Sequence, residues 1–266
     1  QEAEASPGYD VNSAKAYVTV VAGKNARANW TYFSEPPKTG SAELDKKSDN
    51  PSMTDNNNCY SLAGAVYGIW KDASCSGDAW TSMTTDAKGN AKIDGLPFGN
   101  YWVKEITPSK GFELDKTIYP ISVTEANPKA TIHSVEPAGN DPLVITINKI
   151  WNGEETPTIP SLAGTQFTVK YFDNMDKNTS GTPKKTWVLE VQKYPNGIWG
   201  CSLRDKYLVQ NKSDSLYKDP DTGAVLLPYG TYSVQETQHA PGYTFEGTWG
   251  NKDGTVTMST TKPYVA

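Results

Sequence analysis

A strand-like motif occurs twice in the chain, and each copy puts a glutamate on an apolar face. The first copy is Gly99-Asn100-Tyr101-Trp102-Val103-Lys104-Glu105, and the second is Gly230-Thr231-Tyr232-Ser233-Val234-Gln235-Glu236. Because side chains alternate between the faces of a strand, each glutamate shares its face with the tyrosine and the valine of its copy. A desolvated carboxylate takes a partner or keeps its proton, which suits proton transfer. The alternative is a glutamate at a strand end that reaches solvent.

The motif belongs to a longer unit that is repeated in the same order. The shared features are a lysine that ends an apolar face (Lys46, Lys149), a Leu-Ala-Gly turn (Leu62-Ala63-Gly64, Leu162-Ala163-Gly164), the glutamate strand, and a glycine followed by an aromatic residue (Gly111-Phe112, Gly242-Tyr243). In the first copy 105 minus 46 gives 59 residues from lysine to glutamate, whereas in the second 236 minus 149 gives 87. The added residues fall between Phe172 and Leu227, where surface loops with binding residues are expected.

Composition favours an all-β protein built from two domains. The chain of 266 residues has 22 Gly and 18 Pro for turns, and 15 Tyr and 8 Trp, which favour strands. The sequence Gly-Asn-Asp-Pro at 139–142 is typical of a turn and of a domain boundary. We therefore expect a first domain over 1–140, with an N-terminal strand at 16–21, and a second domain with inserted loops over 141–266.

Several classes of function are disfavoured by charge and motif content. Acidic and basic residues are interspersed, with a formal net charge of -5, so neither nucleic acid nor an anionic membrane is expected as a partner. Apolar runs are too short for a transmembrane helix, and the first five residues are either native or the remnant of a secretion leader. With two histidines and no metal-binding Cys/His spacing, we expect no metal and no cofactor. No Ser/His/Asp order or phosphate loop indicates an enzyme with an external substrate.

The three cysteines allow one short-range disulfide. Cys59 and Cys75 bracket a short segment, and Cys201 lies far downstream. A bridge between Cys59 and Cys75 would tie the start of a strand to the turn that follows it. Connectivity cannot be read from sequence, so this pairing is a hypothesis.

Taken together, these motifs resemble the CnaB-type, or SpaA-like, domains of pilins and adhesins of Gram-positive bacteria. The resemblance covers about residues 40–266 and depends on the whole series of motifs. The segments that carry it are Leu62-Ala63-Gly64-Ala65-Val66-Tyr67, Thr85-Asp86-Ala87-Lys88-Gly89-Asn90, the strand of Glu105, and Gly111-Phe112-Glu113-Leu114-Asp115, with Leu162-Ala163-Gly164 and the strand of Glu236 in the second copy. It implies two tandem transthyretin-like (prealbumin-like) β-sandwiches, immunoglobulin-like in outline, with Greek-key connections.

The resemblance also implies an internal cross-link. In this family a lysine of the first strand forms an isopeptide bond with an Asn or Asp of the last strand, while a buried glutamate moves protons. Lys46 with Glu105, and Lys149 with Glu236, match the lysine and the catalytic glutamate by position. The chemistry requires a desolvated amine as nucleophile and an acid that protonates the leaving group.

The acceptor positions depart from the family pattern. The expected inward face of the last strand of the first domain carries Ile132, Ser134 and Glu136, so a glutamate stands where Asn or Asp is expected, and Asn140 and Asp141 follow. In the second domain Val256, Met258 and Thr260 offer no acceptor. The alternative to a bond is a buried Lys-Glu ion pair of little net value to stability.

The sequence therefore predicts a secreted or cell wall-anchored surface protein of adhesin or pilin type, whose anchor lies outside this chain. Such a fragment, expected to be monomeric, would display and bind a host ligand: a glycoprotein, a mucin or an immunoglobulin. The long loops rich in Tyr, Trp and Asn suit recognition of protein or carbohydrate. The alternative is a purely structural stalk without a ligand of its own.

Overall fold

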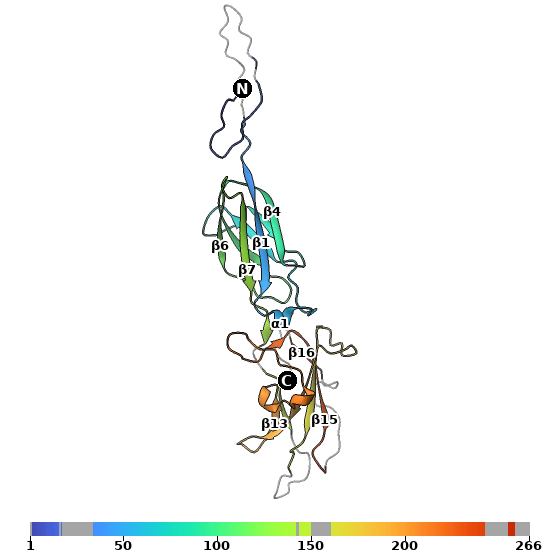
Figure 1. Ribbon diagram of the computed structural model, residues 1–266. Helices are drawn as coiled ribbons and strands as arrows, with labels where there is room; N and C mark the ends of the chain where they lie inside the picture. Colours follow the sequence, from blue (N-terminus) through green and yellow to red (C-terminus); the bar gives the residue numbers. More distant parts are fainter. Residues whose placement is uncertain are drawn as a thin grey trace, which may run out of the picture. The chain divides into compact units, whose positions relative to one another are not determined.

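The computed structural model describes residues 2–15, 17, 34–141, 144–149, 161–242 and 255–258 (Figure 1). The chain divides into two compact units. The first contains Gln1–Lys47, Leu62–Ser109 and Leu114–Glu136, and the second contains Ser48–Ser61, Lys110–Glu113 and Pro137–Ala266. Nearly all regular structure in the described ranges is β-strand, which confirms the predicted fold class. None of the helices in these ranges has the length and apolar character needed to cross a membrane.

Two sheets make up the first unit. One has the strand order β4-β1-β7, with β1 between its neighbours as Figure 1 shows, and the other has the order β3-β2-β5-β6. The strands are β1 (Thr39–Ser48), β2 (Val66–Trp70), β3 (Thr81–Thr84), β4 (Asn90–Pro97), β5 (Gly99–Thr107), β6 (Ile118–Val123) and β7 (Lys129–Glu136). β6 and β7 end the unit, and a turn at 86–90 joins β3 to β4.

The core of this unit follows the alternation expected from the sequence. In β1 the inward side chains are Ala42, Leu44 and Lys46, and all three are buried. In β7 every second residue is buried, and this row ends at Glu136. The apolar members of both rows pack in one cluster with residues of the facing sheet. The same rows thus carry two charged groups into the interior.

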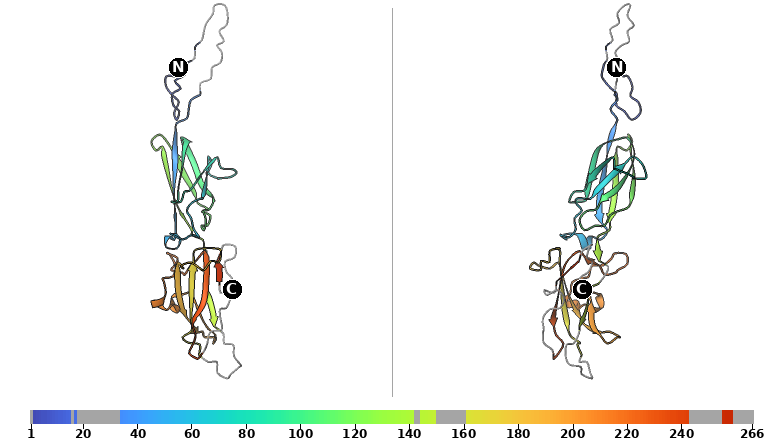
Figure 2. Two further views of the ribbon diagram at one scale, coloured as in Figure 1. Left: turned by 90° about the vertical axis from the view of Figure 1, so that its right-hand side faces the viewer. Right: turned by 180° about the vertical axis from the view of Figure 1, so that it is seen from behind.

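The described residues of the second unit form three sheets. Their orders are β11-β10-β15-β16, β12-β13-β9 and β14-β8, and Figure 2 shows the unit from two further sides. The strands are β8 (Asn140–Asp141), β9 (Thr146–Lys149), β10 (Gln166–Phe172), β11 (Lys185–Glu190), β12 (Gln192–Lys193), β13 (Trp199–Ser202), β14 (Leu227–Pro228), β15 (Gly230–Gln238) and β16 (Thr255–Met258). Short helical turns are α1 (Pro51–Thr54), η1 (Asp205–Tyr207) and η2 (Gln210–Lys212).

The segment Ser48–Ser61 belongs to the second unit by packing, although it directly follows β1. Asn57 donates a hydrogen bond from Nδ2 to the hydroxyl of Tyr171 at 2.8 Å. The hydroxyl of Tyr60 donates to the Gly139 carbonyl and accepts from the backbone N–H of Tyr229. The sequence placed this segment in a first domain over 1–140, and that division of the chain stays a prediction.

The residues that lengthen the second copy build its core. β11 pairs with β10 and buries Trp187 and Leu189. Cys201 and Leu203, from β13 and the residues after it, lie in the same cluster. The expectation of inserted surface loops is therefore correct only for part of this stretch. The rest lies in the core, because its large apolar side chains are buried there.

Two local predictions are wrong, and one cannot be compared. Asn140 and Asp141 form a short strand paired with β14, so these two residues are not in the predicted turn. Cys59 and Cys75 are both free thiols, so the predicted disulfide does not form; Cys59 is buried in the second unit, whereas Cys75 is part of the first. The predicted strand at 16–21 lies outside the described residues, apart from the exposed Tyr17.

Burial also makes two of the thiols poor nucleophiles. It raises the pKa of Cys59 to about 11 and that of Cys201 to about 12. Because the thiolate is the reactive form, both side chains act as small apolar core residues at neutral pH.

The turn that precedes β4 sets up a test of the packing around β1. Gly89 has a φ of +83°, and an added Cβ would lie 2.2 Å from the backbone oxygen of Lys46. Gly95 has a φ of +77° with open space around it. Gly95→Ala should lower the free energy of unfolding by about 1 kcal/mol through backbone strain alone, and Gly89→Ala by about 3 kcal/mol or more because backbone must also move. Urea unfolding measures both; equal losses would contradict the close approach.

Candidate functional site

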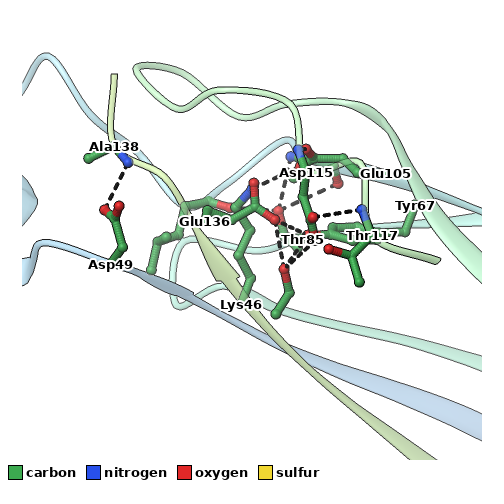
Figure 3. Close-up of polar contacts among 12 residues, drawn as sticks. Lys46, Asp49, Tyr67, Thr85, Glu105, Asp115, Thr117, Glu136 and Ala138 are labelled. Atoms are coloured by element: carbon green, nitrogen blue, oxygen red, sulfur yellow. Dashed lines mark hydrogen bonds and ion pairs between the residues drawn. The ribbon is translucent and has the colours of Figure 1, made fainter. Parts of the chain in front are cut away.

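A lysine lies between two carboxyl groups in the interior of the first unit. Lys46 of β1 has its Nζ 2.9 Å from Oε1 of Glu105 and 3.0 Å from Oε2 of Glu136. All three side chains are fully buried. Figure 3 shows them pointing toward one another from different strands. The structure thus brings together the predicted lysine, the predicted catalytic glutamate and one of the predicted acceptors.

Strand alternation explains how three charged residues reach the same place. Lys46 and Glu136 end the inward rows of β1 and β7, which are neighbours in one sheet. Glu105 ends the inward row of β5, in the other sheet. The motif that opened the sequence analysis therefore puts its carboxylate against the lysine, as predicted, and not in solvent.

Glu136 is held by two hydroxyl groups. Its Oε1 accepts hydrogen bonds from the Tyr67 hydroxyl at 2.5 Å and from Ser134 Oγ at 2.7 Å. Among the described residues its Oε2 accepts no hydrogen bond and has the ion-pair contact with Lys46 instead. The two oxygens of this carboxyl group are therefore chemically distinct.

Glu105 has a different set of neighbours. Its Oε1 accepts from Lys46, and its Oε2 accepts from the backbone N–H of Asp115 at 2.8 Å. The carboxylate of Asp115 is itself fixed by the Thr117 backbone N–H at 2.8 Å and the Tyr119 hydroxyl at 2.6 Å. The loop between β5 and β6 thus orients Glu105 through its backbone.

The charges of this site do not balance if both glutamates are ionised. One ammonium and two carboxylates would leave a net negative charge in an interior without water, and burying that charge costs free energy. The cost falls if one of the two carboxyl groups keeps its proton. Burial raises the pKa of Glu105, although its hydrogen bond from Lys46 acts in the opposite direction. A protonated carboxyl beside an amine is the combination that can transfer protons and form an amide.

The second copy of the motif forms a similar pair with more access to water. Lys149 Nζ lies 2.6 Å from Oε2 of Glu236, and their side chains are 23% and 8% exposed. β16 supplies Val256 and Met258, which have no acceptor group, and Thr260 lies outside the described residues. Among the described residues, Glu236 is the ion-pair partner of this lysine.

The other two predicted acceptors lie elsewhere. Asn140 and Asp141 form β8 in the second unit, whereas Lys46 belongs to the first. Glu136 is therefore the acceptor that the structure places in contact with Lys46.

Three residues of the site were not given a role from the sequence. Tyr67 and Ser134 bind Glu136, and Asp115 orients Glu105. Ser134 precedes Glu136 by two positions and lies on the same inward face. A polar residue at that position was the one feature of the sequence that could have indicated a hydrogen-bond donor for Glu136. Tyr67 and Asp115 come from other parts of the chain, and their proximity depends on the fold. In the described ranges no three His, Cys, Asp or Glu residues are grouped to hold a metal ion.

Comparison with protein families matches residues 52–136 to the SpaA prealbumin-like fold domain. These residues are similar to a SpaA-type domain. The match begins after β1, so Lys46 comes from a strand outside the SpaA-type match, whereas Glu105 and Glu136 lie inside it. The recognised family and fold class are thus confirmed for this part of the chain. A search among curated proteins finds no match.

Several solved structures are similar to the chain at low identity. The Bacillus anthracis TIE protein is 21% identical, with a TM-score of 0.48, over 80% of this chain and 30% of its own. A C-terminal fragment of the pilus adhesin SpaC from Lactobacillus rhamnosus GG is 15% identical, with a TM-score of 0.44, over 77% of this chain and 79% of its own. BcpA*(D312A), the major pilin subunit of Bacillus cereus, is 15% identical, with a TM-score of 0.30, over 86% of this chain and 95% of its own. At these values no role is carried over, and the chain spans less than a third of the TIE protein.

The support of Asp115 gives a pH-dependent prediction. Burial opposes ionisation, but hydrogen bonds from Thr117 and Tyr119 outweigh it and lower the pKa of Asp115 from its usual 3.8. Between these two pKa values the folded state binds fewer protons than the unfolded state, so this contribution to stability exists above pH 3.8 and is lost as pH falls through the lowered pKa.

Asp115→Asn should lower the free energy of unfolding by roughly 2 kcal/mol at neutral pH, and the difference from wild type should shrink below the usual Asp pKa. Urea unfolding as a function of pH measures it. The control is Asp94→Asn, which removes an exposed ion pair with Lys92 and should change stability little. A loss for Asp115→Asn that is independent of pH would contradict the assignment.

Proposed function

We propose that this chain is part of a pilin- or adhesin-type protein of the bacterial surface, and that its first unit is closed by an amide bond between Lys46 and Glu136. Glu105 carries protons in the reaction that forms this bond. The observation that supports the proposal is the contact of Lys46 Nζ with both carboxyl groups, at 2.9 Å and 3.0 Å, in a site without solvent access.

The reaction balances as a condensation. Glu105 is protonated at the start, and Lys46 gives one ammonium proton to Oε2 of Glu136 and becomes a neutral amine. Its Nζ then forms a bond with Cδ of the protonated Glu136, and the bond from Cδ to Oε2 breaks. Glu105 delivers a proton to the departing oxygen and takes the second proton of Nζ, so that one water leaves and Glu105 ends as it began.

Position and dryness favour this step. The strands hold the nucleophile in contact with the acceptor before reaction, so little entropy is lost on the way to the transition state, an advantage worth up to about 7–11 kcal/mol in well-oriented systems. Burial also favours the neutral amine and neutral acid over the separated charges. A glutamate in place of Asn or Asp changes the leaving group and the reach of the acceptor, but not the type of bond formed.

The bond would give the unit mechanical strength. β1 and β7 are the first and last strands of the first unit among the described residues, and they are neighbours in one sheet. A covalent link between them closes the region between Lys46 and Glu136 into a loop that a pull on the ends cannot open. This is the property that a surface stalk needs.

Display of a host ligand is the second part of the proposal, and it depends on the family resemblance. A glycoprotein, a mucin and an immunoglobulin are the expected ligands, and a stalk without a ligand of its own is the alternative. The geometry of the Lys46 site supports load bearing directly. Binding of the whole chain in a glycan array or an immunoglobulin pull-down, removed by competing free ligand, would support display; no binding in either assay would favour the stalk.

Intact mass of the denatured, reduced protein tests the cross-link. We expect wild type to be one water lighter than its sequence mass, and Lys46→Met and Glu105→Gln to have their full sequence masses. Glu136→Gln keeps an acceptor and should lose ammonia instead, which yields the same product mass as wild type. Tandem mass spectrometry should locate the link between Lys46 and residue 136.

The matched control is Lys149→Met, which removes the lysine of the second pair. It should still lose one water, because the described residues offer Lys149 no acceptor besides the glutamate with which it is paired. A wild-type mass equal to the sequence mass would exclude the bond and leave a buried ion pair.

A further inference from the structure

We infer that the hydroxyl groups of Tyr67 and Ser134 act as a donor pair that selects Glu136, and not Glu105, as the carboxyl group attacked by Lys46. The inference depends on the proposed cross-link. It gives the two hydroxyl groups a role in forming that bond, which the family resemblance did not supply. Both hydroxyls contact Oε1 of Glu136, at 2.5 Å and 2.7 Å.

Distance alone does not distinguish the two carboxyl groups. Lys46 Nζ lies 2.9 Å from an oxygen of Glu105 and 3.0 Å from an oxygen of Glu136, and both side chains are fully buried. What differs is the donors on the far oxygen of each group. Glu105 has one backbone N–H there, whereas Glu136 has two hydroxyls.

The hydroxyl protons can both reach Glu136. Ser134 Oγ is 2.7 Å from Glu136 Oε1 but 3.3 Å from Oδ2 of Asp115, so the shorter contact is the stronger bond. Asp115 does not need this proton, because Thr117 and Tyr119 already donate to it. Tyr67 lies 3.0 Å from Ser134 Oγ and 2.5 Å from Glu136, and burial raises the pKa of its hydroxyl, which therefore remains a donor.

The two donors on Oε1 determine which oxygen of Glu136 stays in the amide and which leaves as water. When Nζ attacks Cδ, negative charge develops on the oxygen that stays, and donors placed there in advance stabilise it. Oε1 is that oxygen. Oε2, which has no hydrogen bond from the described residues and lies against Lys46, is the oxygen that leaves as water. Tyr67 and Ser134 thereby polarise the acceptor and set the direction of attack.

The test follows cross-linking over time in full-length protein from cell-free translation, by intact mass. Tyr67→Phe and Ser134→Ala should each slow the loss of water by roughly 10²-fold, the usual effect of removing one oxyanion donor. Tyr101→Phe is the matched control, since its buried hydroxyl donates to the Pro97 carbonyl away from the site, and it should react at the wild-type rate. Wild-type rates in both Tyr67→Phe and Ser134→Ala would overturn the inference.

A second measurement separates this inference from the proposed function. In a Lys46→Met background, where no bond can form, the carboxyl ¹³C resonance of Glu136 should shift on Tyr67→Phe and on Ser134→Ala, and stay unchanged on Tyr101→Phe. An unchanged Glu136 resonance would overturn the donor pair even if wild type cross-links. Wild type at full sequence mass with shifted resonances would exclude the bond, and with it the selecting role, while the hydroxyl contacts would stand.

Discussion

The burial of the Lys46 ammonium is the constraint on which the first unit depends. An unpaired charge in a dry interior costs several kcal/mol or more, so its neighbours must compensate it. Two carboxyl groups do so, and each in turn requires donors of its own: a backbone N–H for Glu105 and two hydroxyls for Glu136. In the polar network between the sheets, the carboxyl groups thus compensate the desolvated amine, and the hydrogen-bond donors compensate the carboxyl groups. An ion pair of this kind adds little to stability by comparison with apolar residues, so stability alone does not explain its presence, whereas the proposed cross-link would.

Much of this arrangement could be predicted from sequence, because strands impose a period of two. Alternation alone gave the inward rows of Lys46 and Glu136 and the inward position of Glu105, and the structure places them so. The repeat predicted the second pair, Lys149 with Glu236, which is also in contact. Local pattern works here because the property in question, which face a side chain occupies, is itself local.

The rest depends on long-range packing. Tyr67 and Asp115 reach the site from strand β2 and from the loop after β5, and no spacing in the sequence indicates which oxygen they approach. The segment Ser48–Ser61 reads as a connection within one domain, yet its Asn57 and Tyr60 are bonded within the second unit. Packing likewise assigns Cys59 to the second unit and Cys75 to the first, although they are close in sequence. In each case tertiary contacts decide between local alternatives of similar energy.

The two copies of the motif differ in the conditions that the proposed condensation requires. Lys149 is 23% exposed, so water solvates its charge and the ion pair with Glu236 can persist without a third group. Lys46 has no such contact with solvent, and the neutral amine that a condensation needs is favoured only there. The first copy also has a carboxyl group at the end of β7 within reach of the amine, whereas the residues of β16 carry none. The proposed condensation thus requires exclusion of water together with an acceptor in contact, and of the two sites in the described residues the first alone meets both conditions.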